Sequence, residues 1–395
     1  MGIRVAENAA ARTMHLYDQQ EVLSHAAAHS AFAAISACPL YAPTPLRLLD
    51  RLAARIDVGN IWYKDESGRF GMGSFKALGG AYAVAWLLQE RLSRRLGRDV
   101  TLAEVVRGGL RKHTQEITVA CATDGNHGRS VAAGARTFGC RCVIFLHAGV
   151  SQGREEAIRA YGAEIVRISG NYDASVLAAT QAAETNGWYV VSDTSWPGYE
   201  ALPRTVMQGY TVMLIEVLRQ LAAAGAPPLT HVFVQGGVGG LAAAVCAHLW
   251  EAMGTAAPIS TVVEPERADC LFQSALAGRP TPASGDLTTV MAGLSCGEVS
   301  TEAWRVLSRS ARFFMTIDDT MAIEAMRVLA RGDGSEESII AGESATAGLA
   351  ALLAVAADPA LRNQFGLTPS SSVLLIGSEG ATDPDLYRQL IAGAV

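Results

Sequence analysis

Short apolar runs alternate with alanine-rich helical stretches along much of the chain, and this alternation is the strongest constraint on its fold. Between residues 116 and 194 the pattern predicts four strands separated by three helices. The strands are expected at 116–124, 140–148, 164–169 and 188–194, and the helices at 126–139, 151–163 and 172–187. Strands that alternate with helices of about ten to fifteen residues form βαβ units around a parallel sheet.

The alternation resumes after residue 230. Residues 230–240 are expected to form a strand that runs into a cluster of glycines, followed by a helix at 241–254 and strands at 259–266 and 371–380. Two mainly parallel sheets therefore fit the pattern better than one. We expect two α/β domains, a large one made of residues 1–85 plus 200–395 and a small one made of residues 86–199.

Composition narrows the class of protein. Half of the 395 residues are hydrophobic, only 18% are charged and the formal net charge is −6, a profile typical of an enzyme-like globule. No run of lysine or arginine lies beside an aromatic cluster, so nucleic acid is not expected as a partner. No stretch of about 20 apolar residues predicts a membrane span, and the N-terminal residues lack the apolar core of a signal peptide. The sequence predicts a cytoplasmic protein.

Several cysteines and acidic residues are expected to be structural. The seven cysteines include no C-x-x-C pair, so no metal site is predicted and most thiols are expected to be buried and free. Cys270 and Cys296 are candidates to meet in the fold, which the sequence does not decide. Asp65 and Glu66 are expected to pair with local amides or basic groups.

A run of glycines lies where a predicted strand meets a predicted helix. In HVFVQGGVGGLAAAV the residues Gly236, Gly237, Val238, Gly239 and Gly240 occupy this junction. Glycine lets backbone N–H groups approach a ligand closely, and a helix start adds unpaired N–H groups and the positive end of the helix dipole. This junction is a candidate phosphate site, although a tight strand-to-helix turn would use the same residues.

Lys76 lies between Phe75 and Ala77 at the start of an apolar helical pattern. In such surroundings an ammonium group is poorly solvated and also faces the unfavourable end of the helix dipole, so the neutral amine is favoured. A neutral, buried lysine amine is what imine formation with an aldehyde requires. A lysine on the protein surface with its amine in water is the alternative.

Two further stretches place polar groups at strand ends. In CATDGNHGRS a predicted strand enters a turn that carries Asp124 and Asn126; Asn126 is a candidate donor to a phenolate-like oxygen, and either residue is also a candidate helix cap. In IGSEGATD, Ser378 follows a predicted buried strand. A hydroxyl group there can bond to a neutral ring nitrogen, whereas a carboxylate would keep such a ring protonated.

A phosphate cradle, an imine-forming lysine, a polar loop and a terminal hydroxyl group together fit pyridoxal 5′-phosphate. The chain resembles the fold type II pyridoxal-phosphate enzymes of the serine/threonine dehydratase superfamily, and more narrowly the diaminopropionate ammonia-lyase family. The motifs run in family order from about residue 40 to 388: KDESGRFGMGSFKALGGAY, ATDGNHGR, VVSDTSWPGY, MQGYTVM, VEPERADC, MAGLSCGE, AGESATAGL and GSEGATD. The resemblance implies two α/β domains with the cofactor between them, and a homodimer.

The resemblance also implies a role for each site residue. Lys76 would hold the cofactor as an internal aldimine, with Phe75 nearby. Asn126 would bind the cofactor O3′, the 236–240 loop its phosphate and Ser378 its ring nitrogen. The substrate carboxylate would be bound by Thr123, Asp124, Gly125 and His127. Common dehydratases have serine at the position of Asp124, whereas the ammonia-lyases have aspartate there and a second aspartate at the position of Asp193.

The reaction implied is α,β-elimination of D- and L-2,3-diaminopropionate to pyruvate and two molecules of ammonia. Lys76 would take the Cα proton from one face, Asp124 from the opposite face, and Asp193 would help the β-amino group to leave. Three alternatives remain: a serine/threonine (or hydroxyaspartate) dehydratase, a β-replacement synthase and a cofactor-binding protein without catalysis. The sequences GMGSFK and GGVGG depart from the lyase pattern and keep the first of these open.

Overall fold

The structure is a computed structural model that divides into two compact units. It describes residues 3–12, 17–123, 125–170, 172–332 and 337–393. Unit 1 comprises Met1–Ala26, Pro43–Phe75 and Met213–Val395, and unit 2 comprises Ala27–Ala42 and Lys76–Val212. Helices α1 (His25–Ser36) and α9 (Ala201–Ala223) contribute residues to both units. The domain boundaries given above from the sequence stay a prediction.

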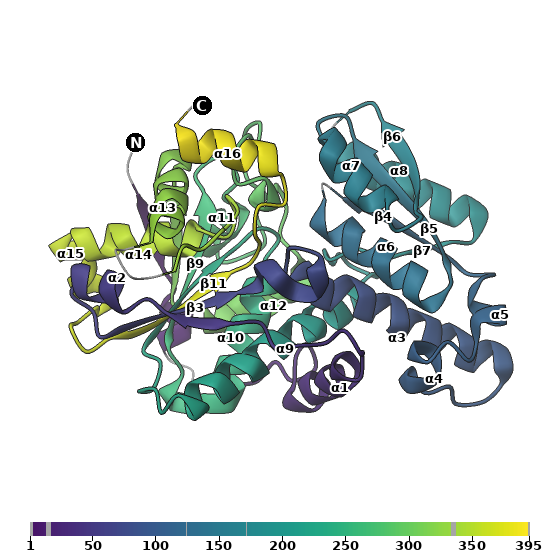
Figure 1. Ribbon diagram of the computed structural model, residues 1–395, viewed down its shortest axis with the longest axis horizontal. Helices are drawn as coiled ribbons and strands as arrows, with labels where there is room; N and C mark the ends of the chain where they lie inside the picture. Colours follow the sequence, from purple (N-terminus) through teal and green to yellow (C-terminus); the bar gives the residue numbers. More distant parts are fainter. Residues whose placement is uncertain (1–2, 13–16, 124, 171, 333–336, 394–395) are drawn as a thin grey trace. The chain divides into compact units, whose positions relative to one another are not determined.

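Unit 1 is built on a seven-stranded sheet whose five central strands are parallel. Its order is β1 (Arg4–Glu7), β10 (Phe313–Ile317), β9 (Ile259–Pro265), β8 (His231–Gln235), β11 (Ser372–Gly377), β3 (Asn60–Asp65) and β2 (Leu46–Leu48), and three of these strands are labelled in Figure 1. Only the two edge strands, β1 and β2, are antiparallel to their neighbours. Every residue of β8, β10 and β11 is buried, as expected for strands covered on both faces.

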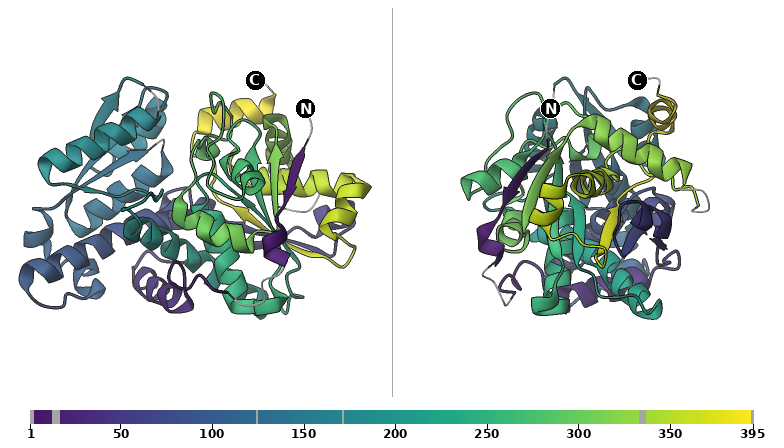
Figure 2. Two further views of the ribbon diagram at one scale, coloured as in Figure 1. Left: turned by 180° about the vertical axis from the view of Figure 1, so that it is seen from behind. Right: turned by 90° about the vertical axis from the view of Figure 1, so that its left-hand side faces the viewer.

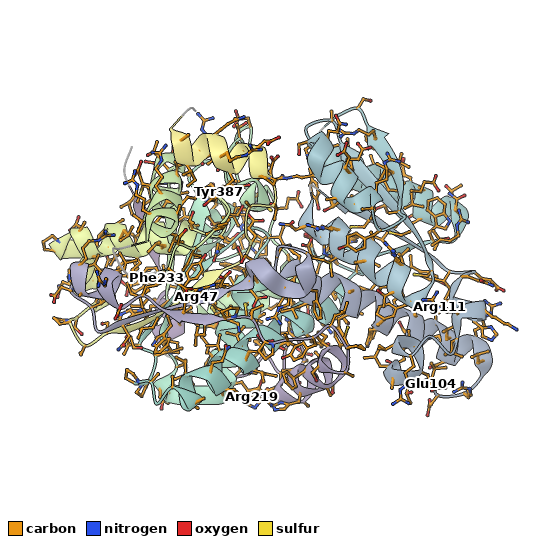
Figure 3. All side chains as sticks on the ribbon, viewed as in Figure 1. Arg47, Glu104, Arg111, Arg219, Phe233 and Tyr387 are labelled. Atoms are coloured by element: carbon orange, nitrogen blue, oxygen red, sulfur yellow. The ribbon has the colours of Figure 1, made fainter. Side chains whose placement is uncertain are left out.

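Helices and short 3-10 turns complete unit 1. The helices are α2 (Asp50–Arg55), α10 (Gly240–Met253), α11 (Cys270–Ala277), α12 (Thr301–Ser310), α13 (Asp319–Arg331), α14 (Ala347–Ala357), α15 (Pro359–Phe365) and α16 (Pro384–Ala392). The 3-10 turns are η1 (Ala9–Arg12), η2 (Glu66–Gly71), η3 (Gly254–Ala256) and η4 (Ala292–Leu294). One core cluster joins the sheet to α14: Phe233, labelled in Figure 3, lies in it and stacks on Phe365 with ring centroids 6.2 Å apart.

Unit 2 is built on a four-stranded sheet in which every pair of neighbouring strands is parallel. Its order is β6 (Glu164–Ile168), β5 (Arg141–His147), β4 (Thr118–Thr123) and β7 (Tyr189–Val190). Its helices are α3 (Lys76–Leu96), α4 (Leu102–Val106), α5 (Arg111–Thr114), α6 (Asn126–Phe138), α7 (Gln152–Arg159) and α8 (Tyr172–Asn186). Figure 2 shows this sheet from behind, with helices on both sides.

The two faces of the unit 2 sheet are covered by different helices. Ala120 and Phe145 pack with Ala179 of α8 in one core cluster. On the opposite face Gly128 of α6 lies so close to the sheet that an added Cβ would come within 2.2 Å of the Thr123 side chain. Successive side chains of a strand point to opposite faces of the sheet, so Ala120 faces α8 and Thr123, three positions later, faces α6.

The expected strand–helix alternation is confirmed in both units. The predicted strands correspond to β4, β5, β6, β7, β8, β9 and β11, and the predicted helices to α6, α7, α8 and α10. The fold class is therefore confirmed as α/β with mainly parallel sheets. No helix within the described residues is long and apolar enough to cross a membrane.

Candidate active site

Lys76 is the first residue of α3, and its amine lies against a carboxylate. Its Nζ donates a hydrogen bond to Oδ2 of Asp193, and the two side chains are 21% and 13% exposed. The expected apolar neighbours are present, since Phe75 and Ala77 are 7% and 4% exposed. The sequence analysis did not pair Lys76 with Asp193, and the neutral amine stays a prediction. The Asp193 carboxylate favours the ammonium form.

Asp193 is placed between two basic groups. Its Oδ2 lies 3.9 Å from Nδ1 of His127, whose Nε2 lies 3.0 Å from the backbone oxygen of Val191. Burial alone would raise the pKa of the Asp193 carboxyl group, but Lys76 and His127 outweigh it and hold this pKa below its ordinary value. Asp193 is therefore ionised at neutral pH and holds the Lys76 ammonium group in position.

Tyr210 of α9 completes the surroundings of the lysine, and the sequence analysis did not single it out. Lys76 Nζ lies 6.0 Å from the centre of the Tyr210 ring. Glycines bring the two helices this close, because a Cβ at Gly79 would lie 2.4 Å from the Tyr210 ring and one at Gly209 would lie 2.4 Å from the Leu78 carbonyl oxygen. Burial raises the pKa of the Tyr210 phenol, which therefore stays protonated. The sequence feature that could have indicated Tyr210 is the MQGYTVM motif, in which it lies.

The turn between β4 and α6 is shaped by Thr123. Its buried Oγ1 accepts hydrogen bonds from the N–H groups of Gly125 and Gly128, each at 3.1 Å. Asn126 is the first residue of α6 and is half-buried, while Gly125 occupies the N-cap position without a side-chain cap. The capping alternative for Asn126 is therefore wrong. Asp124 lies outside the described residues.

In unit 1, the glycine loop joins β8 to α10 as the sequence predicts. Gly237 and Gly239 have φ angles of +62° and +101°, which only glycine adopts without strain. Within the described residues the structure shows no acceptor for the N–H groups of Gly237, Val238, Gly240 and Leu241. N–H groups at a helix start without protein acceptors fit a phosphate group.

Glu264 packs against this loop at Gly236, and the sequence analysis did not identify it. It is 1% exposed, accepts hydrogen bonds from the N–H groups of Leu271 and Phe272 at 3.0 and 2.7 Å, and would clash with a Cβ at Gly236. Burial raises its pKa to about 8. It lies within the predicted strand 259–266, at the start of the VEPERADC motif, and its contacts with Leu271, Phe272 and Gly236 depend on the fold.

Ser378 follows β11, as expected, and is buried at 4% exposure. Its Oγ lies 3.1 Å from Nε2 of Gln235, the last residue of β8, and its carbonyl oxygen accepts a hydrogen bond from the N–H of Phe75 at 2.9 Å. The structure therefore brings Phe75, Ser378 and the strand that leads into the glycine loop together within unit 1. Gln235 was not predicted as a site residue.

The sequence left open whether Cys270 and Cys296 pair with each other. Cys270 and Cys296 form no disulfide, and burial raises the pKa of the Cys270 thiol well above its ordinary value. Within the described residues, no group of three or more histidine, cysteine, aspartate or glutamate side chains is placed to hold a metal ion.

Comparison with known proteins identifies the family. The family model of pyridoxal-phosphate dependent enzymes matches residues 37–376. The chain belongs to the pyridoxal-phosphate-dependent enzymes. Curated diaminopropionate ammonia-lyases of Salmonella typhimurium and Escherichia coli K12 are 38% and 40% identical to it, over 92% and 89% of this chain and 91% and 87% of theirs.

Solved structures agree with the sequence relatives. Two structures of the Escherichia coli diaminopropionate ammonia-lyase, one with an aminoacrylate-PLP azomethine intermediate and one with D-serine, match with TM-scores of 0.89 and 0.90. Both are 36% identical to this chain, and the match covers 100% of this chain and 97% of theirs. The resemblance stated from the motifs is confirmed, as are the fold type II architecture and pyridoxal phosphate as the cofactor.

The glycine loop allows a direct test of phosphate binding. Replacing Gly239 with alanine should raise the Kd for pyridoxal phosphate about tenfold and cost about 1–3 kcal/mol of stability, because the φ of +101° is strained for alanine and its Cβ would lie 3.0 Å from that of Ala303. Spectrophotometric titration measures the Kd. Gly153→Ala in α7, where a Cβ would meet nothing within 4 Å, is the control. An unchanged Kd in Gly239→Ala would contradict this role of the loop.

Proposed function

We propose that this protein catalyses the α,β-elimination of D- and L-2,3-diaminopropionate to pyruvate and two molecules of ammonia. The observation that carries the proposal is the contact between the Lys76 amine and the Asp193 carboxylate, because it supplies a group that can take up and return a proton. The names of the most similar relatives support the choice of substrate. A cytoplasmic homodimer is part of the same proposal.

The residues that would hold the cofactor come from several elements. Lys76 would bind its aldehyde carbon covalently, Asn126 its O3′ and Ser378 its ring nitrogen, with Phe75 packed nearby. The phosphate would lie on the N–H groups of the loop formed by Gly236, Gly237, Val238, Gly239 and Gly240. The substrate carboxylate would be bound by the turn residues Thr123, Asp124, Gly125 and His127.

When bound, pyridoxal phosphate supplies the electron sink that stabilises negative charge at the substrate Cα. Lys76 would accept the Cα proton of one enantiomer and Asp124 that of the other. Asp193 would orient Lys76 and keep its amine protonated after the transfer, so that this proton is ready for the departing β-amino group. One water molecule enters overall: 2,3-diaminopropionate plus water gives pyruvate plus two ammonia.

A hydroxyl group at the ring nitrogen suits an elimination. The electrons left at Cα depart with the β-substituent, so a strongly electron-withdrawing protonated ring is less necessary. A neutral ring also disfavours transamination and racemisation, which draw on the same carbanion. Ser378 would thus help to select the outcome of the reaction.

The experiment that tests the proposal follows two products at once. Purified holoenzyme is incubated with D- and L-2,3-diaminopropionate, L-serine and L-threonine, and pyruvate or other ketoacid is measured together with ammonia. We expect two ammonia per pyruvate from both diaminopropionate enantiomers. Turnover of the hydroxy amino acids alone would establish the dehydratase instead, and a product that requires an added thiol would establish a β-replacement synthase.

Asp193 gives the sharpest mutational test of this chemistry. The Asp193→Asn variant should lose about 10²–10⁴-fold in kcat, because the neutral amide no longer stabilises the Lys76 ammonium group or assists its proton transfers. Steady-state kinetics with L-2,3-diaminopropionate measures this. Asp57→Asn makes the same chemical change at a side chain that is 74% exposed and should leave kcat unchanged. A kcat within about twofold of wild type in Asp193→Asn would remove Asp193 from the proposed mechanism.

A further inference from the structure

Gln235 is a buried polar residue that the proposed function does not use. It ends β8 directly before the glycine loop and is 1% exposed. Its Nε2 lies 2.6 Å from the carbonyl oxygen of Ile376, 3.0 Å from that of Ala345 and 3.1 Å from Oγ of Ser378. All four residues belong to unit 1.

The chemistry of these partners fixes the orientation of the Gln235 amide. The backbone oxygens of Ile376 and Ala345 only accept hydrogen bonds, so the amide nitrogen and not its oxygen must face them. Within the described residues, Oε1 of Gln235 is buried and has no hydrogen-bond partner. An unpaired buried acceptor destabilises the folded state. The Gln235 amide is therefore oriented so that its N–H groups are hydrogen-bonded, while its oxygen has no partner within the described residues.

This orientation decides the direction of the hydrogen bond to Ser378. The amide nitrogen carries no free lone pair and has two hydrogens for three oxygens, so the Ser378 hydroxyl can only accept a shared hydrogen from it, and the hydroxyl proton must point elsewhere. Across the described part of the chain the structure shows no acceptor for that proton, although Ser378 is only 4% exposed. A buried hydroxyl proton directed away from Gln235 calls for an acceptor outside the protein.

We propose that Gln235 is a positioning residue that makes the Ser378 hydroxyl group a hydrogen-bond donor to the unprotonated ring nitrogen of pyridoxal phosphate. A serine without this neighbour can donate or accept, and would then also tolerate a protonated ring. Gln235 thus restricts the cofactor to the neutral ring that favours elimination. The inference deepens the proposed function and rests on its assignment of Ser378 to the ring nitrogen.

The test compares two cofactors that differ only at the ring nitrogen. In Gln235→Met, which removes both N–H groups at similar length, the Kd for pyridoxal phosphate should rise about 3- to 10-fold, the loss of roughly one hydrogen bond. The Kd for the carbocyclic analogue, which has C–H in place of the ring nitrogen, should change less than about twofold, because no such hydrogen bond exists to be lost. Equal increases in both Kd values would mean that Gln235 only supports the loop, which overturns the inference.

Two further variants make the result independent of folding. Gln235→Glu keeps the size of the side chain but replaces the amide nitrogen with a carboxyl group, which no longer holds the Ser378 hydroxyl as an acceptor, so the same selective loss is expected. Gln235→Met combined with Ser378→Ala should bind pyridoxal phosphate no more weakly than Ser378→Ala alone, because Gln235 acts through that hydroxyl. Additive losses in the double variant would overturn the inference.

Thr346→Val is the matched control for the loss of buried hydrogen bonds. The fully buried Thr346 hydroxyl lies 3.0 and 3.2 Å from the backbone oxygens of Ala322 and Glu343, and within the described residues it has no hydrogen bond to Ser378. Its loss should leave the Kd ratio of the two cofactors unchanged. Because these readouts are binding constants, a holoenzyme that releases no ammonia from diaminopropionate contradicts the proposed function but leaves this comparison intact.

Discussion

The Lys76→Ala variant should carry no covalently attached cofactor and lose about 10⁴-fold or more in kcat, because one side chain supplies both the covalent link and the Cα base. The chain makes this expectation unusually clear, since it contains three lysines, Lys64, Lys76 and Lys112. Lys64 is fully buried and its amine bonds to Thr44, Glu216 and Gln220, so it has no donor or space left for an aldehyde.

Borohydride reduction followed by peptide mass spectrometry measures the attachment directly. The wild-type protein should carry the reduced cofactor on the peptide that contains Lys76, and the Lys76→Ala variant should carry none. Lys112→Ala removes an exposed lysine from α5 and is the control that should keep both the label and the activity. A label on Lys64 or Lys112 in the wild-type protein would refute the assignment of the site and with it the proposed function.

Local patterns were sufficient for most of the central fold. Parallel strands such as β5, β8 and β11 are buried on both faces, and such strands have nearly continuous apolar sequences. This makes them recognisable as short apolar runs followed by helical stretches. The edge strands β1 and β2 have no such apolar run. In β1, Arg4 lies opposite Thr316 in a pairing that joins residues more than 300 positions apart, and nothing local indicates it.

The candidate site divides in the same way. Lys76, Ser378 and the glycine loop occupy ends of elements, where residue type and local structure together suggest a role. The ion pair of Lys76 with Asp193 depends on two residues 117 positions apart, and the Gln235 amide matters only because β11 lies beside β8. Residue type reveals which chemistry is available, whereas the partner of each group is decided by tertiary packing.

Asp65 and Glu66 illustrate a role that the sequence did predict. Both were expected to pair with nearby amides or basic groups, and this is confirmed. Asp65 accepts from the N–H of Ser67 and pairs with Arg47, labelled in Figure 3. Glu66 is fully buried and pairs with Arg69. The sequence did not predict that Glu66 belongs to a buried ionic cluster, formed with Lys64, Arg69 and Glu216.

The Glu216→Ala variant should lose about 3–5 kcal/mol of unfolding free energy. This is the largest loss of stability that we expect from a single substitution in this protein. Glu216 lies on α9 at 2% exposure, and its Oε2 lies 2.7 Å from both Lys64 Nζ and Arg69 Nη2. Its removal leaves two buried cations with one carboxylate, Glu66. Although burial alone would raise its pKa, Arg69 and Lys64 hold the pKa of Glu216 below its ordinary value, so the charge that is lost is present at neutral pH.

Urea denaturation at pH 7 measures this loss, and the pH dependence identifies its origin. A carboxyl group with a lowered pKa contributes stability above its unfolded pKa of about 4.3 and loses it as the pH falls. The difference between wild type and Glu216→Gln should therefore shrink as the pH is lowered below about 4. Glu90→Ala breaks the exposed pair with Arg94 and should cost less than about 1 kcal/mol. If Glu216→Ala lost no more unfolding free energy than Glu90→Ala, water or rearrangement would compensate for the missing carboxylate. The charges of the cluster would then not hold η2 and α9 in place.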